Sequence, residues 1–201
     1  GHLRARAIWV LAQLGKRGRA KVAEYLTAED DAEKPLVAYR ALRHADPSGT
    51  LVRTKALAGS KFLSVRREVA VSLRDVAYEQ CKSALDDLID AYDGRNRYYL
   101  EALGVAFTNK EKEVYRELVA PRFPNPEKWS KTAKRLAWRL YTPESIRDLD
   151  TCIRSQMPPV DEFRFLAMAF ASFRNDEERK ERKERLLELG KLAEFQPVHY
   201  Q

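Results

Sequence analysis

Residue types that carry acid–base or nucleophilic chemistry are sparse in this sequence. Beyond His2, the histidines are His44 and His199. We expect His44 at the end of a helix, where a cation suits the helix dipole, and His199 in a C-terminal tail. The HExxH, GxSxG, P-loop and dinucleotide-binding patterns are absent from the sequence. We therefore assign no catalytic residue and expect a protein that is not an enzyme.

Metal and redox chemistry find equally little support. Asp86, Asp87 and Asp90 cluster on one expected helix, but no second acidic group can be placed beside them at metal-ligand spacing. Cys81 and Cys152 lie 71 residues apart, and neither stands in a CxxC or CxxCH motif. We interpret both thiols as small helix-packing residues and expect no disulfide, no metal ion and no cofactor.

Aromatic and charged side chains suited to a binding surface are more regularly placed. Large aromatic residues with arginines nearby are the usual materials of such surfaces. The candidates are Arg6, Trp9, Arg40, Arg67, Arg97, Tyr98, Glu101, Arg135 and Trp138. We expect these residues to contact a partner, and we expect Trp9 and Trp138 to be at least partly exposed.

These candidates recur because the chain repeats one helical pattern about six times. The clearest copy is Val65–Asp75 (VRREVAVSLRD), which begins with basic residues and continues with apolar residues at helical spacing. The other copies are Leu3–Ala12, Lys34–Arg43, Arg95–Gly104, Thr132–Tyr141 and Glu162–Ala171. The anchoring apolar residues are Leu11, Leu42, Leu73, Leu103, Leu140 and Phe170. Their spacings of 31, 31, 30, 37 and 30 residues are typical of a helical solenoid.

This pattern predicts an all-α fold in which about six helix pairs wind into a right-handed α-α superhelix. We expect residues 1–2 to be a tag remnant, residues 3–175 the solenoid, and residues 176–201 a C-terminal capping helix and tail. The alternating charges of Arg179–Arg185 are typical of an exposed helix. The first copy lacks a preceding partner helix, so we expect a fragment of a larger multidomain protein. No apolar run approaches the roughly 18–20 residues of a membrane span, so we expect no membrane insertion.

The central copy resembles a HEAT-like repeat. VRREVAVSLRD matches the V-R-x-x-A-x-x-x-L form with Val65, Arg66, Val69, Ala70 and Leu73 in register. The period of about 31 residues is shorter than the roughly 40–47 of long HEAT or armadillo units, which indicates the short HEAT-like variety. The resemblance implies a HEAT-like or armadillo-type solenoid.

A narrower resemblance covers most of the chain. The segments 4–15, 65–73, 92–104 and 136–145 are similar to the helical-repeat region of large exported bacterial proteins. Those proteins also carry a sorbosone-dehydrogenase-like propeller and a c-type haem domain. The resemblance implies export to the periplasm or cell envelope, but it carries over no haem, because this sequence has no CxxCH motif.

The concave face of a HEAT-type stack is lined by the second helix of each pair, so the aligned copies display three rows there. The first row is Arg6, Val37, Glu68, Tyr98, Arg135 and Phe165. The second row is Trp9, Arg40, Val71, Glu101, Trp138 and Met168. The third row is Ala5, Leu36, Arg67, Arg97, Lys134 and Arg164. The alternative to a binding surface is that the aromatic rings pack between repeats and the arginines pair with acids of the next repeat. Arg4 and Arg66, at the helix starts, occupy positions where such bridges are common.

Charge leaves two functional classes open. The net charge is +7, with basic and acidic residues interleaved along most of the chain. The first hypothesis is a monomeric scaffold whose partner is a protein or a neighbouring domain of the parent chain. The alternative is nucleic acid, bound as duplex DNA on a basic concave face as in HEAT-like DNA glycosylases, although Glu68, Glu101 and Glu162 weaken such a track. Lyases that attach bilin chromophores also use short HEAT-like repeats, but no distinguishing residue supports that activity here.

Overall fold

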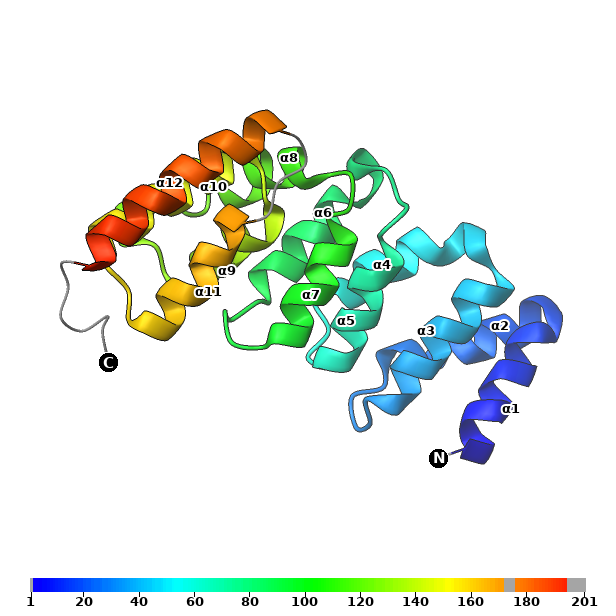
Figure 1. Ribbon diagram of the computed structural model, residues 1–201. Helices are drawn as coiled ribbons and strands as arrows, with labels where there is room; N and C mark the ends of the chain where they lie inside the picture. Colours follow the sequence, from blue (N-terminus) through cyan, green and yellow to red (C-terminus); the bar gives the residue numbers. More distant parts are fainter. Residues whose placement is uncertain (1, 172–175, 195–201) are drawn as a thin grey trace. The chain divides into compact units, whose positions relative to one another are not determined.

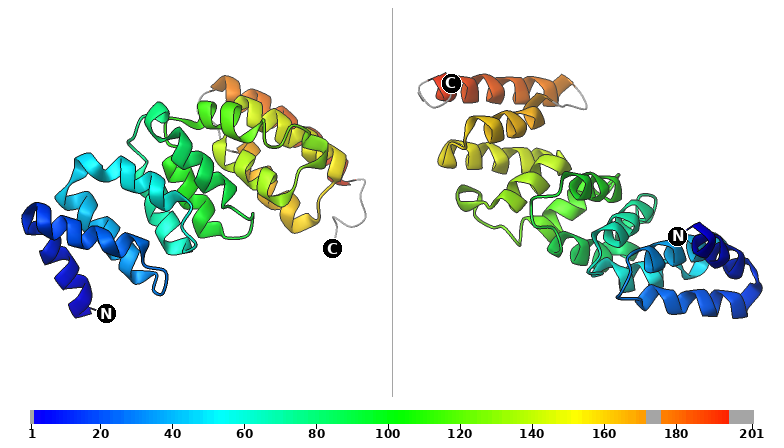
Figure 2. Two further views of the ribbon diagram at one scale, coloured as in Figure 1. Left: turned by 180° about the vertical axis from the view of Figure 1, so that it is seen from behind. Right: turned by 90° about the horizontal axis from the view of Figure 1, so that it is seen from below.

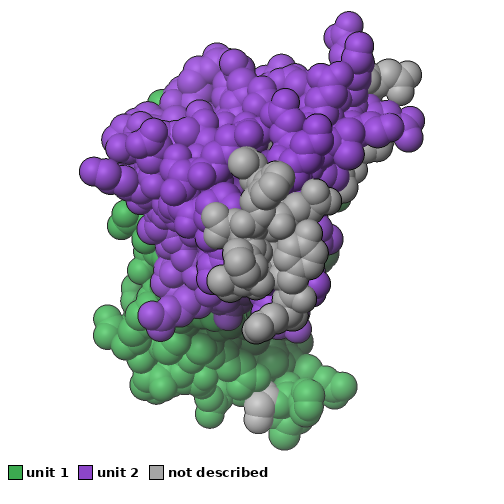
Figure 3. All heavy atoms as spheres, turned by 60° about the vertical axis from the view of Figure 1, so that its left-hand side comes forward, with its two compact units in different colours: residues 1–91 green, residues 92–201 purple. Residues whose placement is uncertain are grey.

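The computed structural model describes residues 2–171 and 176–194, and the regular elements in these ranges are all helices (Figure 1). The prediction of an all-α fold is therefore confirmed for the described part of the chain. The chain divides into two compact units, Gly1–Ala91 and Tyr92–Gln201 (Figure 3). We call them unit 1 and unit 2 and describe each by itself.

Unit 1 is built from helices that pack on their sequence neighbours. Its α-helices are α1 (His2–Gln13), α2 (Gly15–Ala23), α3 (Glu33–Ala45), α4 (Thr50–Ala58), α5 (Leu63–Ser72) and α6 (Tyr78–Asp90). Helix α1 packs against α2 and α3, α3 packs against α4 and α5, and α4 packs against α6. Helices α1, α3 and α5 are therefore successive neighbours (Figures 1 and 2). We call them the inner helices of unit 1.

Unit 2 continues the same order of packing within itself. Its α-helices are α7 (Arg97–Ala106), α8 (Glu111–Val114), α9 (Lys131–Leu140), α10 (Pro143–Gln156), α11 (Val160–Ala171) and α12 (Asp176–Glu194). Helix α9 packs against α7, α10 and α11, while α12 packs against α10 and α11. We call α7, α9 and α11 the inner helices of unit 2.

Local sequence signals place several helix starts in unit 2. The side chains of Asn96 and Ser130 accept hydrogen bonds from backbone N–H groups in the first turns of α7 and α9. Thr142 and Ser145 form a reciprocal capping box at the start of α10, with Pro143 as the first residue of the helix. These bonds satisfy N–H groups that a helix leaves unpaired at its start.

Four of the six anchoring residues of the repeat pattern are buried, as the proposed register requires. The anchors that are 1% exposed or less are Leu42, Leu73, Leu103 and Leu140. Leu11 is partly buried, and the side chain of Phe170 lies outside the described residues. The core of the first two copies is a cluster of Ile8, Ala12, Val22, Ala38, Ala41 and Leu42. Small residues in this cluster let α1 and α3 approach closely.

Helix α2 follows α1 almost directly, since α1 ends at Gln13 and α2 begins at Gly15. Gly15 has φ +73°, a left-handed conformation that glycine adopts without steric cost. The chain therefore reverses at a single bend rather than over a loop.

The C-terminal helix differs from the prediction of an exposed charged helix. Arg182 is only 4% exposed, and its guanidinium donates to the backbone carbonyl oxygens of Ala169 at 3.3 Å and Tyr141 at 3.1 Å. Arg185 donates to the carboxylate of Asp150 at 3.0 Å. The prediction is wrong at Arg182, because its guanidinium binds backbone carbonyl oxygens of α11 and of Tyr141, the residue after α9, and a charge pattern does not reveal such acceptors.

The anchor Leu73 supplies a direct test of the repeat packing. Replacing Leu73 by Ala removes a buried side chain and should lower the free energy of unfolding by about 2–5 kcal/mol. Val71→Ala is the matched control, because Val71 lies two residues before Leu73 in the last turn of α5 but is 45% exposed. Urea denaturation measures both variants. Equal midpoints for Leu73→Ala and the parent protein would contradict the register.

Candidate binding groove

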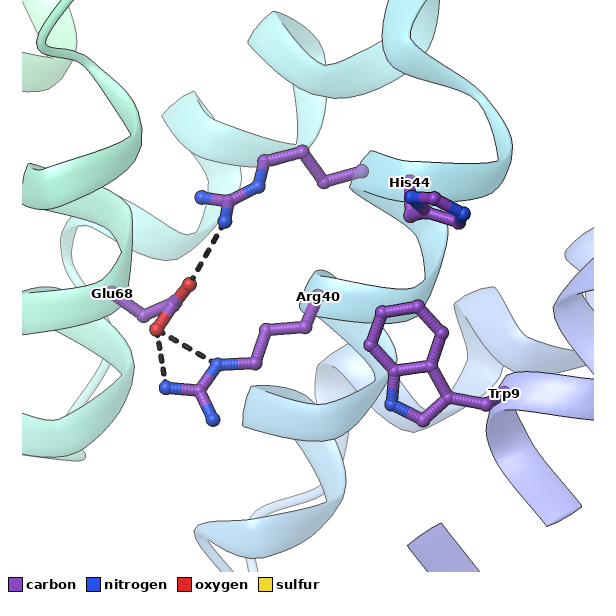
Figure 4. Close-up of a pocket in the computed structure, with 5 residues that line it drawn as sticks. Trp9, Arg40, His44 and Glu68 are labelled. Atoms are coloured by element: carbon purple, nitrogen blue, oxygen red, sulfur yellow. Dashed lines mark hydrogen bonds and ion pairs between the residues drawn. The ribbon is translucent and has the colours of Figure 1, made fainter. Parts of the chain in front are cut away.

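An open groove in unit 1 joins three inner helices. Its volume is about 430 Å³, and it is lined by Trp9 of α1, by Arg40, Arg43 and His44 of α3, and by Glu68 of α5 (Figure 4). The Trp9 and His44 rings have centroids 5.7 Å apart. The groove therefore has an aromatic side and a charged side.

The helical period explains how these residues meet. Arg40, Arg43 and His44 stand at positions i, i+3 and i+4 of α3, so they share one face of that helix. Trp9 precedes Arg40 by one repeat of 31 residues, and Glu68 follows on the next inner helix. The groove is thus a direct product of stacking equivalent helices.

The charged side of the groove holds two cations against one anion. Arg40 donates to Glu68 Oε2 from Nε at 2.8 Å and from Nη2 at 2.5 Å, while Arg43 Nη2 lies 3.2 Å from Oε1. The Glu68 side chain is 12% exposed, whereas the Arg40 and Arg43 side chains are 49% and 37% exposed. The local excess of positive charge faces solvent, so the groove favours an anionic group.

The exposure prediction for the two tryptophans has opposite outcomes. Trp9 is 37% exposed, which confirms the prediction for that residue. Trp138 is 7% exposed, so the prediction is wrong there. Its ring stacks on Phe165 with a centroid distance of 4.4 Å and an interplanar angle of 30°. In the aligned rows, the position that Phe165 holds opposite Trp138 is held by Val37 opposite Trp9 and by Glu68 opposite Arg40, so neither position of unit 1 carries an aromatic ring.

The remaining predicted residues do not join this groove. Arg6 and Arg67 are exposed on α1 and α5 of unit 1, and Arg97 and Tyr98 are exposed on α7 of unit 2. In unit 2, Glu101 accepts from Arg139 Nε at 3.2 Å, and the Arg135 guanidinium lies over the Phe165 ring at 5.0 Å. Of the predicted set, the groove brings together Trp9 and Arg40.

Two groove residues were not predicted. Arg43 and His44 lie three and four residues after Arg40, a spacing that places them on the same helix face. The repeat rows omitted them because only positions matched across the aligned copies were compared. The helical spacing within α3 was the signal that could have found them.

Ion pairs between neighbouring inner helices support the alternative of pairing between repeats. Such pairs join Arg40 of α3 to Glu68 of α5, Arg139 of α9 to Glu101 of α7, and Lys134 of α9 to Glu162 of α11. At the helix starts, Arg4 pairs with Asp31 at 3.2 Å, whereas Arg66 donates to the Ser60 carbonyl oxygen at 2.5 Å. Ion pairs between neighbouring inner helices therefore neutralise much of the charge that was expected to be available to a partner.

The structure gives no geometric support to metal chemistry in its described part. Within residues 2–171 and 176–194, no group of three or more His, Cys, Asp or Glu residues could hold a metal ion. The helices in these ranges include none that is both long and apolar enough to cross a bilayer. Cys81 and Cys152 are both buried, and neither is part of a disulfide bond. Burial raises the pKa of the Cys152 thiol to about 11.

Comparisons with protein-family models, with curated proteins and with solved structures found no match to this chain. The groove is therefore interpreted from its own geometry and charge.

The raised pKa of Cys152 predicts a slow thiol reaction. At pH 8 a thiol of pKa about 11 carries roughly 200-fold less thiolate than an unfolded cysteine of pKa about 8.5. In a Cys81→Ser variant, reaction with Ellman's reagent should be at least about tenfold slower in the native state than in guanidinium, because the higher intrinsic nucleophilicity of a high-pKa thiolate offsets only part of its lower abundance. Because the thiol ionises at a lower pH in the unfolded state than in the folded state, its ionisation favours unfolding. The contribution of the neutral thiol to the free energy of unfolding is therefore fully present below about pH 8.5 and is lost between about pH 8.5 and pH 11. Labelling of native Cys152 at the rate of a free thiol would contradict its placement.

Proposed function

We propose that this chain is a non-catalytic helical-repeat scaffold that holds a protein segment or a neighbouring domain against its inner helices. The observation that carries the proposal is the groove of unit 1, where the exposed Trp9 ring lies beside two guanidinium groups. Exposed tryptophan and arginine are the residue types that contribute most at protein interfaces. The scaffold role accounts for a site that offers contact area and charge.

The groove chemistry favours a segment that carries a carboxylate next to an apolar side chain. A carboxylate can bind Arg40 and Arg43 through charge-assisted hydrogen bonds, in competition with Glu68. An apolar or aromatic side chain can pack on Trp9, whose ring is accessible from the same groove. An acidic protein segment meets both requirements.

The finer description of the architecture is part of the same proposal. We propose a short HEAT-like right-handed superhelix, similar to the repeat region of exported bacterial multidomain proteins. Its support is the 31-residue offset of Leu11, Leu42 and Leu73, together with the packing of α1 on α3 and α3 on α5. Units stacked in this way present continuous side surfaces for partners.

Duplex DNA binding is the alternative class. The acids Glu68, Glu101 and Glu162 pair with cations of neighbouring inner helices, which reduces the positive field along both sets of inner helices. A protein that neutralises several phosphates must lose affinity steeply as salt rises. Filter binding with duplex DNA at low ionic strength distinguishes the scaffold hypothesis from the DNA-binding hypothesis. Salt-sensitive retention of the DNA would support DNA binding, and no retention would rule it out.

Opposite effects of two groove variants test the proposal. The probe is the peptide acetyl-Glu-Phe-Glu-Glu-amide, followed by quenching of Trp9 fluorescence. Trp129 and Trp138 are 4% and 7% exposed, so Trp9 dominates the accessible signal. Arg43→Ala should weaken binding about tenfold, because one charge-assisted contact is lost. Glu68→Gln should strengthen binding several-fold, because the competing carboxylate is removed while the side-chain size is kept.

Lys55→Ala is the matched control, since Lys55 is an exposed cation of unit 1 that does not line the groove. Thermal unfolding of each variant excludes loss of the fold as the cause of a change. If Arg43→Ala and Lys55→Ala change affinity equally, the groove is not the binding site. Weaker binding by Glu68→Gln would contradict the proposed competition between Glu68 and the peptide carboxylate for Arg40 and Arg43.

A further inference from the structure

Each inner helix of unit 2 carries a cationic residue followed directly by a residue with an aromatic or guanidinium group, both of which are planar. The three pairs are Arg97 with Tyr98 in α7, Lys134 with Arg135 in α9, and Arg164 with Phe165 in α11. Each planar residue stands five positions before the apolar anchor of its repeat, so the three are equivalent in the repeat. Because α9 packs against both α7 and α11, they follow one another across unit 2 (Figure 1). We call Tyr98, Arg135 and Phe165 the planar row.

The combination is specific to unit 2. The equivalent pairs on the inner helices of unit 1 are Ala5 with Arg6, Leu36 with Val37, and Arg67 with Glu68. In these pairs no cation is followed by an aromatic or guanidinium group. The planar row is therefore not a general consequence of the repeat, whose shared positions are the apolar anchors.

The planar row is accessible at one end and rigid at the other. Tyr98 is 69% exposed, whereas Arg135 and Phe165 are partly buried. The Arg135 guanidinium lies over the Phe165 ring at 5.0 Å, and the same ring stacks on Trp138 with a centroid distance of 4.4 Å. These contacts hold Arg135 and Phe165 in place, so a ligand that binds there orders few further side chains. An exposed ring and a supported guanidinium plane can each stack on a nucleobase.

Cations border the planar row on all three helices. Arg97 of α7, Lys131 of α9 and Arg164 of α11 are exposed. Lys131 lies one turn before Arg135, on the same face of α9. Each planar group therefore has an accessible cation on its own helix, which favours a ligand with regularly spaced negative charges.

The acids of these helices leave most of that charge available. Glu101 pairs with Arg139 at 3.2 Å, and Glu162 pairs with Lys134 at 2.9 Å. Lys134 is only 7% exposed, so this second pair is withdrawn from the surface. Asp161 is an exposed acid in the first turn of α11 and opposes the field there. The pairs thus remove Arg139 and Lys134 from recognition but not the cations that border the row.

We propose that the planar row of unit 2 binds single-stranded nucleic acid. Bases stack on the Tyr98 ring and on the Arg135 guanidinium, which Phe165 supports. Phosphates meet the exposed cations beside the row. Neighbouring packed helices lie about 8–10 Å apart, so a strand that crosses them meets one planar group per helix. Helical repeats can read a single strand at one base per repeat. This inference goes beyond the proposed function, which concerns the groove of unit 1.

Two other anionic ligands fit the planar row less well. Duplex DNA keeps its bases stacked on one another, so they cannot reach the Tyr98 ring. An acidic protein segment supplies carboxylates but has no flat ring at regular spacing. A single strand supplies one anion and one flat ring in each unit of its chain, which matches a cation and a planar group on each helix.

The experiment uses the full chain and a fluorescent strand of about 12 thymidines, followed by fluorescence anisotropy. Binding should weaken at least about tenfold between about 50 and 200 mM salt, because phosphate contacts release counterions. Tyr98→Ala should weaken binding at least about fivefold, because a stacking contact is lost. Tyr98→Phe keeps the ring and should keep the parent affinity. Equal effects of these two variants, or no binding by the parent protein, would overturn the inference.

Charge variants test the phosphate contacts. Arg164→Ala should weaken binding and lower the slope of log affinity against log salt by about 0.7. Asp161→Asn should strengthen binding several-fold, because an opposing charge is removed. Arg116→Ala is the matched control, since Arg116 is 70% exposed in unit 2 but lies outside the inner helices. Thermal unfolding of each variant excludes loss of the fold. Equal effects of Arg164→Ala and Arg116→Ala would contradict the proposed site.

Competing probes separate single strands from other anions. An abasic strand of the same length keeps the phosphates and should bind at least about tenfold more weakly, because no base can stack. Equal binding of the abasic strand, equal binding of the matching duplex, or equal displacement by a glutamate-rich peptide would each overturn the inference. A matching strand of uridines is measured alongside, and the tighter of the two single strands identifies DNA or RNA as the ligand.

The two sites can fail independently. Arg43→Ala, in the groove of unit 1, should leave strand binding unchanged, and Tyr98→Ala should leave the groove's response to the acidic peptide unchanged. A chain that binds the peptide but not the strand would refute only the planar-row proposal. A chain that binds the strand but not the peptide would refute only the groove. Equal weakening of strand binding by Arg43→Ala and Tyr98→Ala would show that the planar row is not the site.

Discussion

Close packing of each inner helix on the next is the interaction on which the rest of unit 1 depends. It uses small side chains at the contact, with Ala12 of α1 against Ala38 and Ala41 of α3. Tyr39 extends the connection, because its hydroxyl lies 2.7 Å from Thr54 Oγ1 of α4 and 2.6 Å from Ser72 Oγ of α5. An amphipathic helix has no other place to bury its apolar face in such a stack. Each helix is therefore stable only where a neighbour covers it, and any uncovered apolar face stands out.

Ion pairs between inner helices contribute less to stability than this apolar packing does. Arg40 with Glu68, and Glu101 with Arg139, bridge neighbouring helices at partly exposed positions. Exposed or half-exposed pairs contribute only about 0–1 kcal/mol each, so they do not hold the stack together. Their effect is to neutralise charge along the inner helices. What remains for recognition is the local excess at Arg43, which accounts for the small extent of the groove.

Much of the helical framework could be predicted from sequence because glycine, proline and the apolar period act locally. Helix α4 begins at Thr50 and ends at Ala58, as its flanking glycines indicate. Burial of Trp138 could not be predicted, because it depends on the ring of Phe165 from the next inner helix. Burial of Arg182 could not be predicted either, since its acceptors are backbone carbonyls. For the site, the rows identified Trp9 and Arg40 but not the residues on the same helix face beside them.

Two kinds of surface remain when helices are covered only by their neighbours: the sides of the stack and the outer faces of its helices. The groove is a side surface, and its chemistry is set by the residues that α1, α3 and α5 bring together there. The outer face of α1 is of the second kind, since Val10 stands one repeat before Ala41, which in α3 belongs to the core cluster shared with α1. In unit 2, by contrast, α10 and α11 are covered by α12, whose Arg182 is buried among backbone acceptors.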